Sequence, residues 1–293
     1  MRPVPPPTYA RCYLCDADPG VVSGVAIHHS NRYLRRSLPC RRRQLWMWRI
    51  DELRWILTAK DALEQALHDG LPGFRLIPGL SEREVREFEK RQGAPLSSEA
   101  REVLLFASGF TYEPFGGVTF LGKDDFTFPS LFPKAIALAG DGSGNFWVLD
   151  VREDSGAWGR VLFVSHDPPV VVVQAADLAQ YVHQVLAVGR SDDAQELDEV
   201  ATHASLRIWR EDPDLIDVVA ARQSADPMLS KFAAELPDAY RIADLRNAGR
   251  GTGFTWGRNG PQTDVRRFDS ELLFGIEPKR GGSFINRVLG RKR

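Results

Sequence analysis

Residues 136–151 read IALAGDGSGNFWVLDV, two apolar runs separated by a turn rich in glycine and small polar residues. The runs Ile136–Ala139 and Phe146–Val151 have the length and apolar content that are typical of buried strands. Between them, Gly140–Asn145 supplies the residue types that a tight connection requires. We therefore predict a β-hairpin in which the two runs pair antiparallel.

Three further runs of this kind surround the hairpin, at Gly117–Phe120, Arg160–Val164 and Val170–Val173. The tripeptide Asp154-Ser155-Gly156 predicts a second hairpin turn, between the strand at Phe146–Val151 and the one that follows it. Because strands joined by short connections usually pair with their sequence neighbours, we expect an antiparallel meander.

Helical patterns precede these strands. Ser81 with Glu84 forms a capping-box pattern that opens one helix, and Gly93 ends it. A second helix begins near Ser97-Ser98, carries the apolar run Val103–Phe106 and is expected to end at Gly109. An earlier amphipathic helix is indicated by leucines and an isoleucine at three- and four-residue spacing, namely Leu53, Ile56, Leu57, Leu63 and Leu67.

A last helix follows the strands. Asp177 can cap it, and its apolar residues fall on one face, which would pack on the sheet: Leu178, Tyr181, Val182, Val185 and Leu186. The predicted fold class is therefore α+β, an antiparallel meander sheet flanked by helices.

The chain divides by composition into four parts. Residues 1–46 are proline- and arginine-rich without an apolar period, so they are expected to be disordered or to precede a natural start at Met47. Residues 47–189 hold the α+β domain, 190–217 form an acidic linker, and 218–293 form a small C-terminal α+β module of unknown role. In that module, Gly253–Trp256 and Thr263–Phe268 are expected to pair as a hairpin around Asn259-Gly260.

Composition excludes several classes of protein. With 43% hydrophobic and 26% charged residues the chain is expected to be globular, and no apolar stretch is long enough to span a membrane. The start lacks the apolar centre of a secretory signal, which favours a cytoplasmic location without a membrane partner. The three cysteines all lie before residue 41 and predict no disulfide framework.

Charge is distributed unevenly along the chain. The net charge is +6 over residues 1–46, −6 over 47–191, −7 over 192–217 and +6 over 218–293, which sums to −1. An acidic middle favours basic partners and repels nucleic acid, so we expect a protein partner and no nucleic-acid binding.

The order of these elements resembles the SUKH superfamily, which also includes cell-wall-assembly regulators of the yeast type. The resemblance covers about residues 74–188, and it departs from the family pattern at Pro95-Leu96 and Ser108-Gly109, where Leu-Pro and Asn-Gly are usual. The matching segments are Leu80-Ser81 with Phe88-Glu89, Ile136–Gly144, Phe146–Asp150 and His166-Asp167.

The resemblance implies a non-catalytic binding module without cofactor, most specifically a bacterial immunity protein that neutralises a cognate toxin. Against a basic, nuclease-like toxin, exposed acids would steer association, and an outward aromatic side chain would anchor the interface. The alternative is an intracellular regulatory interaction scaffold of the cell-wall-assembly-regulator type. The candidate interface residues are Asp124, Asp125, Trp147, Asp150, Glu153, Asp154 and Trp158.

Residue types in two segments are those of ligand sites, one for zinc and one for phosphate. A single Cys12-x-x-Cys15 with His28, His29 and Cys40 has the ligand types of a zinc site but lacks a second matched pair, so no metal is predicted. The glycine-rich Gly140–Gly144 precedes a strand, whereas a phosphate-binding loop precedes a helix.

Two hypotheses would make this protein an enzyme. Ser143, His166 and Asp167 have the residue types of a hydrolase triad but no Gly-x-Ser-x-Gly elbow, so catalysis there is not expected. An enzyme whose anionic-ligand pocket lies in the C-terminal part would draw on Arg241, Arg246, Arg250, Trp256 and Arg258.

Overall fold

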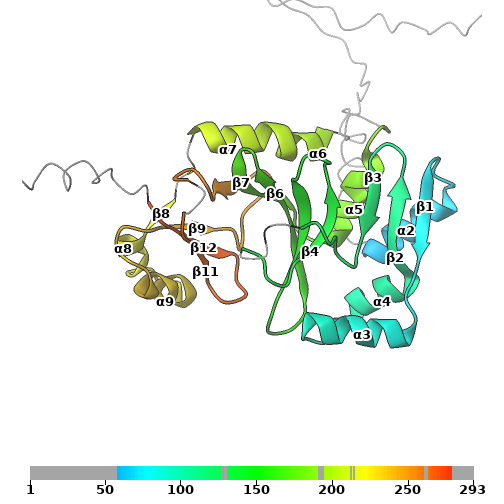
Figure 1. Cartoon of the computed structure of the whole chain (residues 1–293), viewed down its shortest axis with the longest axis horizontal. Coiled ribbons are helices and arrows are strands. Elements are labelled where there is room, and N and C mark those ends of the chain that lie inside the picture. Colours follow the sequence, from blue (N-terminus) through cyan, green and yellow to red (C-terminus); the bar gives the residue numbers. More distant parts are fainter. Residues whose placement is uncertain are drawn as a thin grey trace, which may run out of the picture. The chain divides into compact units, whose positions relative to one another are not determined.

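The computed structural model describes residues 58–126, 128, 131–190, 195–211, 213, 215–260 and 263–278, all within one compact unit, 47–293 (Figure 1). The expectations for residues 1–46, including the cysteine–histidine zinc alternative, lie outside the described residues. Among the described residues, no helix is both long and apolar enough to cross a membrane.

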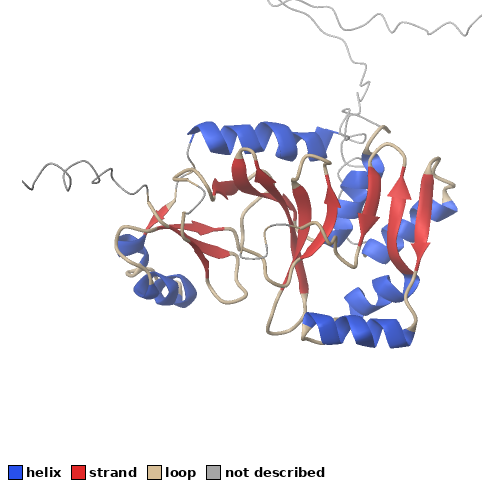
Figure 2. Ribbon diagram, in the orientation of Figure 1, coloured by secondary structure: helices blue, strands red, loops and turns tan. Residues whose placement is uncertain are grey.

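The predicted meander is confirmed for the strands after residue 135, whereas the run predicted at Gly117–Phe120 lies in a separate sheet. Strands β4 to β7 follow one another in a five-stranded antiparallel sheet of order β10-β7-β6-β5-β4, seen in red in Figure 2. Their bounds are β4 Ile136–Gly140, β5 Phe146–Val151, β6 Trp158–His166, β7 Pro169–Ala175 and β10 Gly253–Thr255.

A second antiparallel sheet has the order β1-β2-β3, formed by Phe74–Pro78, Ala107–Tyr112 and Gly116–Thr119. Its central strand was not expected, because the preceding helix was predicted to run on to Gly109. A β-carbon added at Gly109 would lie 2.3 Å from the Val118 carbonyl oxygen, so the close approach of β2 and β3 requires glycine there. The small residue that resembled a helix stop serves the pairing of two strands.

Helices form at the four predicted places, although the first is described only from its cap Thr58, so that Leu53, Ile56 and Leu57 of that prediction lie outside the described residues. The helices are α2 Ala59–His68, α3 Glu82–Gln92, α4 Ser98–Phe106 and α5 Leu178–Ala187. Ser81 and Glu84 form the expected capping box, and Gly93 ends α3 in the left-handed conformation (φ 77°). The Asp177 side chain accepts from the Gln180 backbone N–H at 2.8 Å, as predicted for the start of α5.

Alternation along the strands gives the five-stranded sheet two apolar faces. On one face, Trp147, Leu149 and Phe163 share a core with α2 and α5. On the other face, side chains of the meander share a core with the C-terminal residues Leu245, Phe254 and Phe274. Both faces of this sheet are therefore buried.

The segment predicted as an acidic linker differs from expectation. Its described part contains α6 Gln195–Asp198, the π-helical turn η2 Glu199–Ala204 and α7 Ser205–Glu211, which pack on β7 and β10. The apolar residues that bury this helical stretch recur every three or four positions among the acids: Leu197, Val200, Ala204 and Ile208. The many acidic residues between these apolar positions make the helical spacing hard to recognise in the sequence.

The C-terminal part is α+β, as expected, with a four-stranded sheet of order β11-β12-β9-β8. Its elements are β8 Ile216–Asp217, α8 Val218–Ala221, α9 Pro227–Glu235, β9 Arg241–Asp244, β11 Val265–Arg267 and β12 Leu273–Ile276. The hairpin predicted around Asn259-Gly260 is wrong, because β10 pairs with β7 while β11 pairs with β12. Burial of Phe254 in the shared core decides this pairing.

Candidate protein-binding surface

The loop between β5 and β6 is a tight hairpin turn held by its own backbone. The Arg152 N–H donates to the Ala157 carbonyl at 3.0 Å, and the Gly156 N–H donates to the Arg152 carbonyl at 2.8 Å. Gly156 has φ +66°, and a β-carbon there would lie 2.2 Å from the carbonyl oxygen of Pro95 in the α3–α4 loop. Glycine is thus needed both for the turn and for its packing against that loop.

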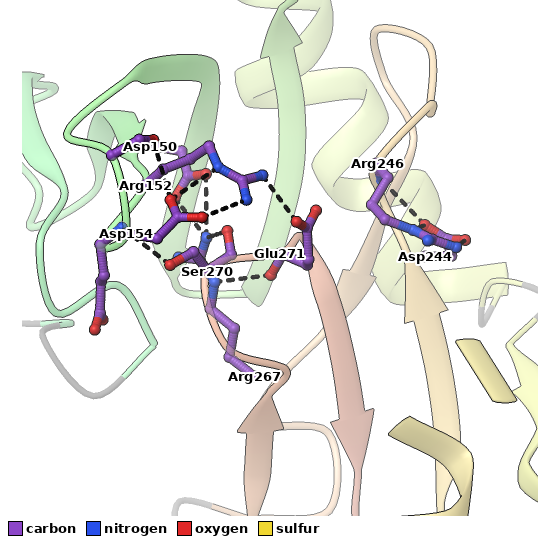
Figure 3. Close-up of polar contacts among 10 residues, drawn as sticks. Asp150, Arg152, Asp154, Asp244, Arg246, Arg267, Ser270 and Glu271 are labelled. Atoms are coloured by element: carbon purple, nitrogen blue, oxygen red, sulfur yellow. Dashed lines mark hydrogen bonds and ion pairs between the residues drawn. The ribbon is translucent and has the colours of Figure 1, made fainter. Parts of the chain in front are cut away.

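On its other side, this hairpin contacts the turn between β11 and β12 (Figure 3). The Glu153 backbone N–H donates to Ser270 Oγ at 3.0 Å. Arg152 donates to Glu271 Oε1 at 2.8 Å and holds Asp154 with two further bonds, at 3.1 and 2.9 Å. The β11–β12 turn and the β5–β6 hairpin therefore form one polar network, although about a hundred residues separate them in sequence.

A buried ion pair lies beneath this network. Arg267 Nη2 lies 2.8 Å from Asp150 Oδ1 and 3.1 Å from Oδ2, and only 9% and 5% of the two side chains are exposed. Arg267 also donates to the carbonyls of Ser270 and Glu271, both at 2.9 Å. Its guanidinium is thus satisfied by one carboxylate and two carbonyls, as a buried charge requires.

The two carboxylates of the hairpin have opposite pKa shifts. Burial raises the pKa of Asp150, and the pairing with Arg267 opposes that effect only in part. Hydrogen bonds from Arg152 and Ser155 lower the pKa of Asp154 to about 2. Asp154 therefore carries its charge at any physiological pH, at the solvent-facing tip of the hairpin.

The surface over this network is acidic. Glu153, Asp154 and Asp269 are exposed. The two turns, residues 152–157 and 268–272, hold four acids (Glu153, Asp154, Asp269, Glu271) and one arginine (Arg152), a net charge of −3. Among the residues described, no cluster of histidine, cysteine and carboxylate side chains has the arrangement of a metal site. The chemistry available here is electrostatic recognition.

Comparison with known proteins gave one match. Residues 79–184 match the SMI1 / KNR4 family (SUKH-1). This confirms the resemblance found in the sequence, over slightly more than a third of the chain. No curated protein and no solved structure gave a match.

The SUKH-1 region runs from just before α3 into α5 and therefore contains the whole β5–β6 hairpin. The residues that hold the hairpin from the other side, Arg267, Ser270 and Glu271, lie outside it. Sequence reasoning missed them, because the contacts join positions 117 to 119 residues apart and no local pattern marks such pairs.

Two of the candidate interface residues do not lie at the surface. Trp147 is only 7% exposed, donates from Nε1 to Gln174 Oε1 at 3.1 Å, and packs on Phe115 and Phe163. Asp150 is buried in its ion pair. Alternation places Trp147 on the helix-covered face of the sheet, so neither residue is available to a partner.

The other candidates lie in different places. Glu153 and Asp154 are exposed together at the tip of the hairpin. Trp158 is partly buried opposite Val151 and packs on the core under the helices. Asp124 and Asp125 are exposed between β3 and β4, and no hydrogen bond or ion pair within the described residues joins them to the hairpin.

The alternative sites within the SUKH-1 region have structural explanations. In the Gly140–Gly144 loop, Asp141 Oδ1 accepts from the backbone N–H groups of Ser143 (2.8 Å) and Asn145 (3.1 Å). The carboxylate of the loop itself takes the amides that a phosphate would need. His166 Nδ1 lies 3.0 Å from Asn145 Oδ1, so its partner is a side-chain amide and not the Ser143 hydroxyl that a triad requires.

The C-terminal residues considered for an anionic pocket each have a separate structural partner. Arg241 pairs with Asp217, Arg246 with Asp244, and Arg250 with Glu196. Trp256 donates to the Ser165 carbonyl at 2.9 Å, and Arg258 lies over the Trp209 ring. The structure does not gather them into one pocket.

Proposed function

We propose that this protein is a non-catalytic binding module, and specifically a bacterial immunity protein that neutralises a cognate toxin in the cytoplasm. The observation that carries the proposal is the acidic tip of the β5–β6 hairpin, Glu153 and Asp154, presented within a region that matches SUKH-1. The resemblance to immunity proteins supplies the class of partner. The acidic side chains of the tip imply that the surface of this partner is basic.

The partner that fits this tip is a protein with a basic surface, such as a nuclease that binds phosphates. Like charges exclude nucleic acid itself, whereas opposite charges accelerate encounter with a basic protein. Because such acids act mostly on the rate of association, their removal should slow binding, and the effect should diminish as salt is raised.

The test begins with the full chain, affinity-tagged and expressed in its native host. Proteins that co-elute in stoichiometric amount are identified by mass spectrometry, and the leading candidate is expressed with and without this protein. Recovery of growth on co-expression supports the immunity role. Recovery of housekeeping proteins alone would favour the regulatory scaffold instead.

Charge-reversal variants then test the surface. Glu153→Lys with Asp154→Lys should reduce the association rate at low salt by about tenfold or more. Glu102→Lys is the matched control, because Glu102 is an exposed acid on α4 outside the hairpin. Equal association rates in the two variants would remove the hairpin tip from the interface.

A further inference from the structure

The C-terminal part covers one face of the five-stranded sheet β10-β7-β6-β5-β4. Strand β10 extends that sheet at the β7 edge, with Phe254 opposite Val171. Phe254 is fully buried, and its ring centroid lies 4.8 Å from that of Phe274 on β12. These rings share a core with Phe146, Val148, Leu162 and Val164 of the meander. The apolar contact is continuous, so the two parts are docked over a broad area.

Several polar contacts between the two parts lie beside the hairpin. Arg267 bonds Asp150 at the end of β5 and the two carbonyls of its own turn. Ser270 Oγ accepts from the Glu153 N–H, and Arg152 reaches Glu271. At the base of the hairpin, Arg160 donates to the carbonyls of Arg246 (3.2 Å) and Ala248 (2.7 Å). Apart from the bonds within the β11–β12 turn, each of these contacts joins the hairpin or its flanking strands to residues after position 240.

Apart from the backbone bonds of the turn, the bonds of Asp154 to Arg152 and Ser155, and the packing of Gly156 on Pro95, the hairpin tip has no support from an apolar core. Residues 153–155 are exposed and lie outside the three apolar cores. A segment with few buried contacts opens locally at low cost in free energy unless hydrogen bonds restrain it. The bonds from the β11–β12 turn are such a restraint.

We propose that the β11–β12 turn is a clamp that fixes the conformation of the β5–β6 hairpin, with Arg267 and Ser270 as its positioning residues. The clamp itself follows from the contacts alone. Its consequence for recognition rests on the function proposed above, in which the hairpin tip meets the partner. A binding loop that is already ordered loses less conformational entropy on association, so the clamp would raise affinity without touching the partner.

Amide hydrogen exchange on the full chain tests the clamp. Ser270→Ala removes the acceptor of the Glu153 N–H, and exchange at Glu153 should rise about tenfold, as expected for loss of one hydrogen bond. Arg267→Met should raise exchange throughout 152–157 and 268–272 by a larger factor than in β6 and β7. Arg267→Lys keeps the charge but loses the planar fork, so an intermediate increase is expected.

Arg266→Met is the matched control, because Arg266 is the neighbouring arginine on β11 but pairs with Asp264 and lies over Tyr240. It should leave hairpin exchange unchanged. Unchanged exchange at Glu153 in Ser270→Ala would overturn the proposal. So would an increase in Arg267→Met that is equal in the hairpin and in β6 and β7, since that outcome reflects general loss of stability.

The experiments can refute the clamp and the proposed function independently of each other. If Arg267→Lys and Ser270→Ala loosen the hairpin but the identified partner binds with unchanged affinity, the clamp stands and the hairpin is not the interface. If the hairpin keeps its protection in both variants, the clamp is refuted whatever the partner does.

Discussion

Asp150 and Arg267 form a buried ion pair, 2.8 Å between Oδ1 and Nη2, across 117 residues of sequence. Asp150 is the penultimate residue of β5 in the SUKH-1 region, and Arg267 is the last residue of β11 in the C-terminal sheet. Guanidinium contacts with the rings of Phe132 and Phe274, at 5.6 and 5.8 Å, place the pair beside the apolar core that the two parts share. A charge in such a place is tolerated only with its partner.

Removal of either side chain of the pair should therefore lower the free energy of unfolding. Arg267→Met leaves the Asp150 carboxylate buried without a counter-charge, and the free energy of unfolding should fall by about 3 kcal/mol. The double variant Asp150→Leu with Arg267→Met removes both charges and should recover a large part of that loss. Urea unfolding of the two single variants and the double variant measures the coupling. Strictly additive losses would show that the two side chains do not interact.

The depressed pKa of Asp154 predicts how the stability of the fold depends on pH. Its pKa is depressed to about 2 in the folded protein, whereas the ordinary value is 3.8. A depressed carboxyl pKa contributes stability that is present above pH 4 and is lost as the pH falls from about 4 to 2. Asp154→Asn should flatten the stability profile in that window, and above pH 5 it should lower stability by a constant amount without changing the slope of the profile.

Arg152→Gln gives the matching spectroscopic test, because it removes the main cause of the shift. Carboxyl carbon chemical shifts followed by NMR should place the Asp154 pKa closer to 3.8 in this variant. A midpoint that stays near 2 would contradict the assignment of the shift to Arg152.

The sequence predicted well what local chemistry determines. The Ser81–Glu84 capping box, the Gly93 stop and the meander of β4 to β7 depend on residues within a few positions of one another, and all formed as expected. Among the candidate interface residues, Glu153 and Asp154 are exposed. This could be predicted, because the residues of a tight turn usually face solvent.

Three of the failures share a physical cause, which is contact between residues far apart in sequence. Residues 253–256 have the composition of a hairpin strand, but their partner β7 lies more than eighty residues earlier. Trp147 beside acids resembled an interface anchor, and only the cover by α5 and Phe115 shows that it is core. Arg267 has no local signal of its role at all.

The helix α4 offers a test of capping at two adjacent serines. Both Ser97 and Ser98 were plausible N-caps in the sequence, and the structure assigns the role to Ser97, whose Oγ accepts from the Ala100 N–H at 3.2 Å. Ser97→Ala should lower the free energy of unfolding by about 1 kcal/mol. Ser98→Ala lies one residue inside the helix and should change it by less than about 0.5 kcal/mol. The reverse order would move the cap to Ser98.

Phe254 tests whether the C-terminal part and the SUKH-1 region unfold together. It is fully buried in the core between them, so Phe254→Ala should lower the free energy of unfolding by about 3–5 kcal/mol. Because one core joins both parts, the variant should still unfold in a single transition, at a lower urea concentration. Met228→Ala is the control, since Met228 is 38% exposed on α9 and its truncation should cost little. Two separate transitions, with only one moved by Phe254→Ala, would mean that the parts fold independently and that their shared core contributes little to stability.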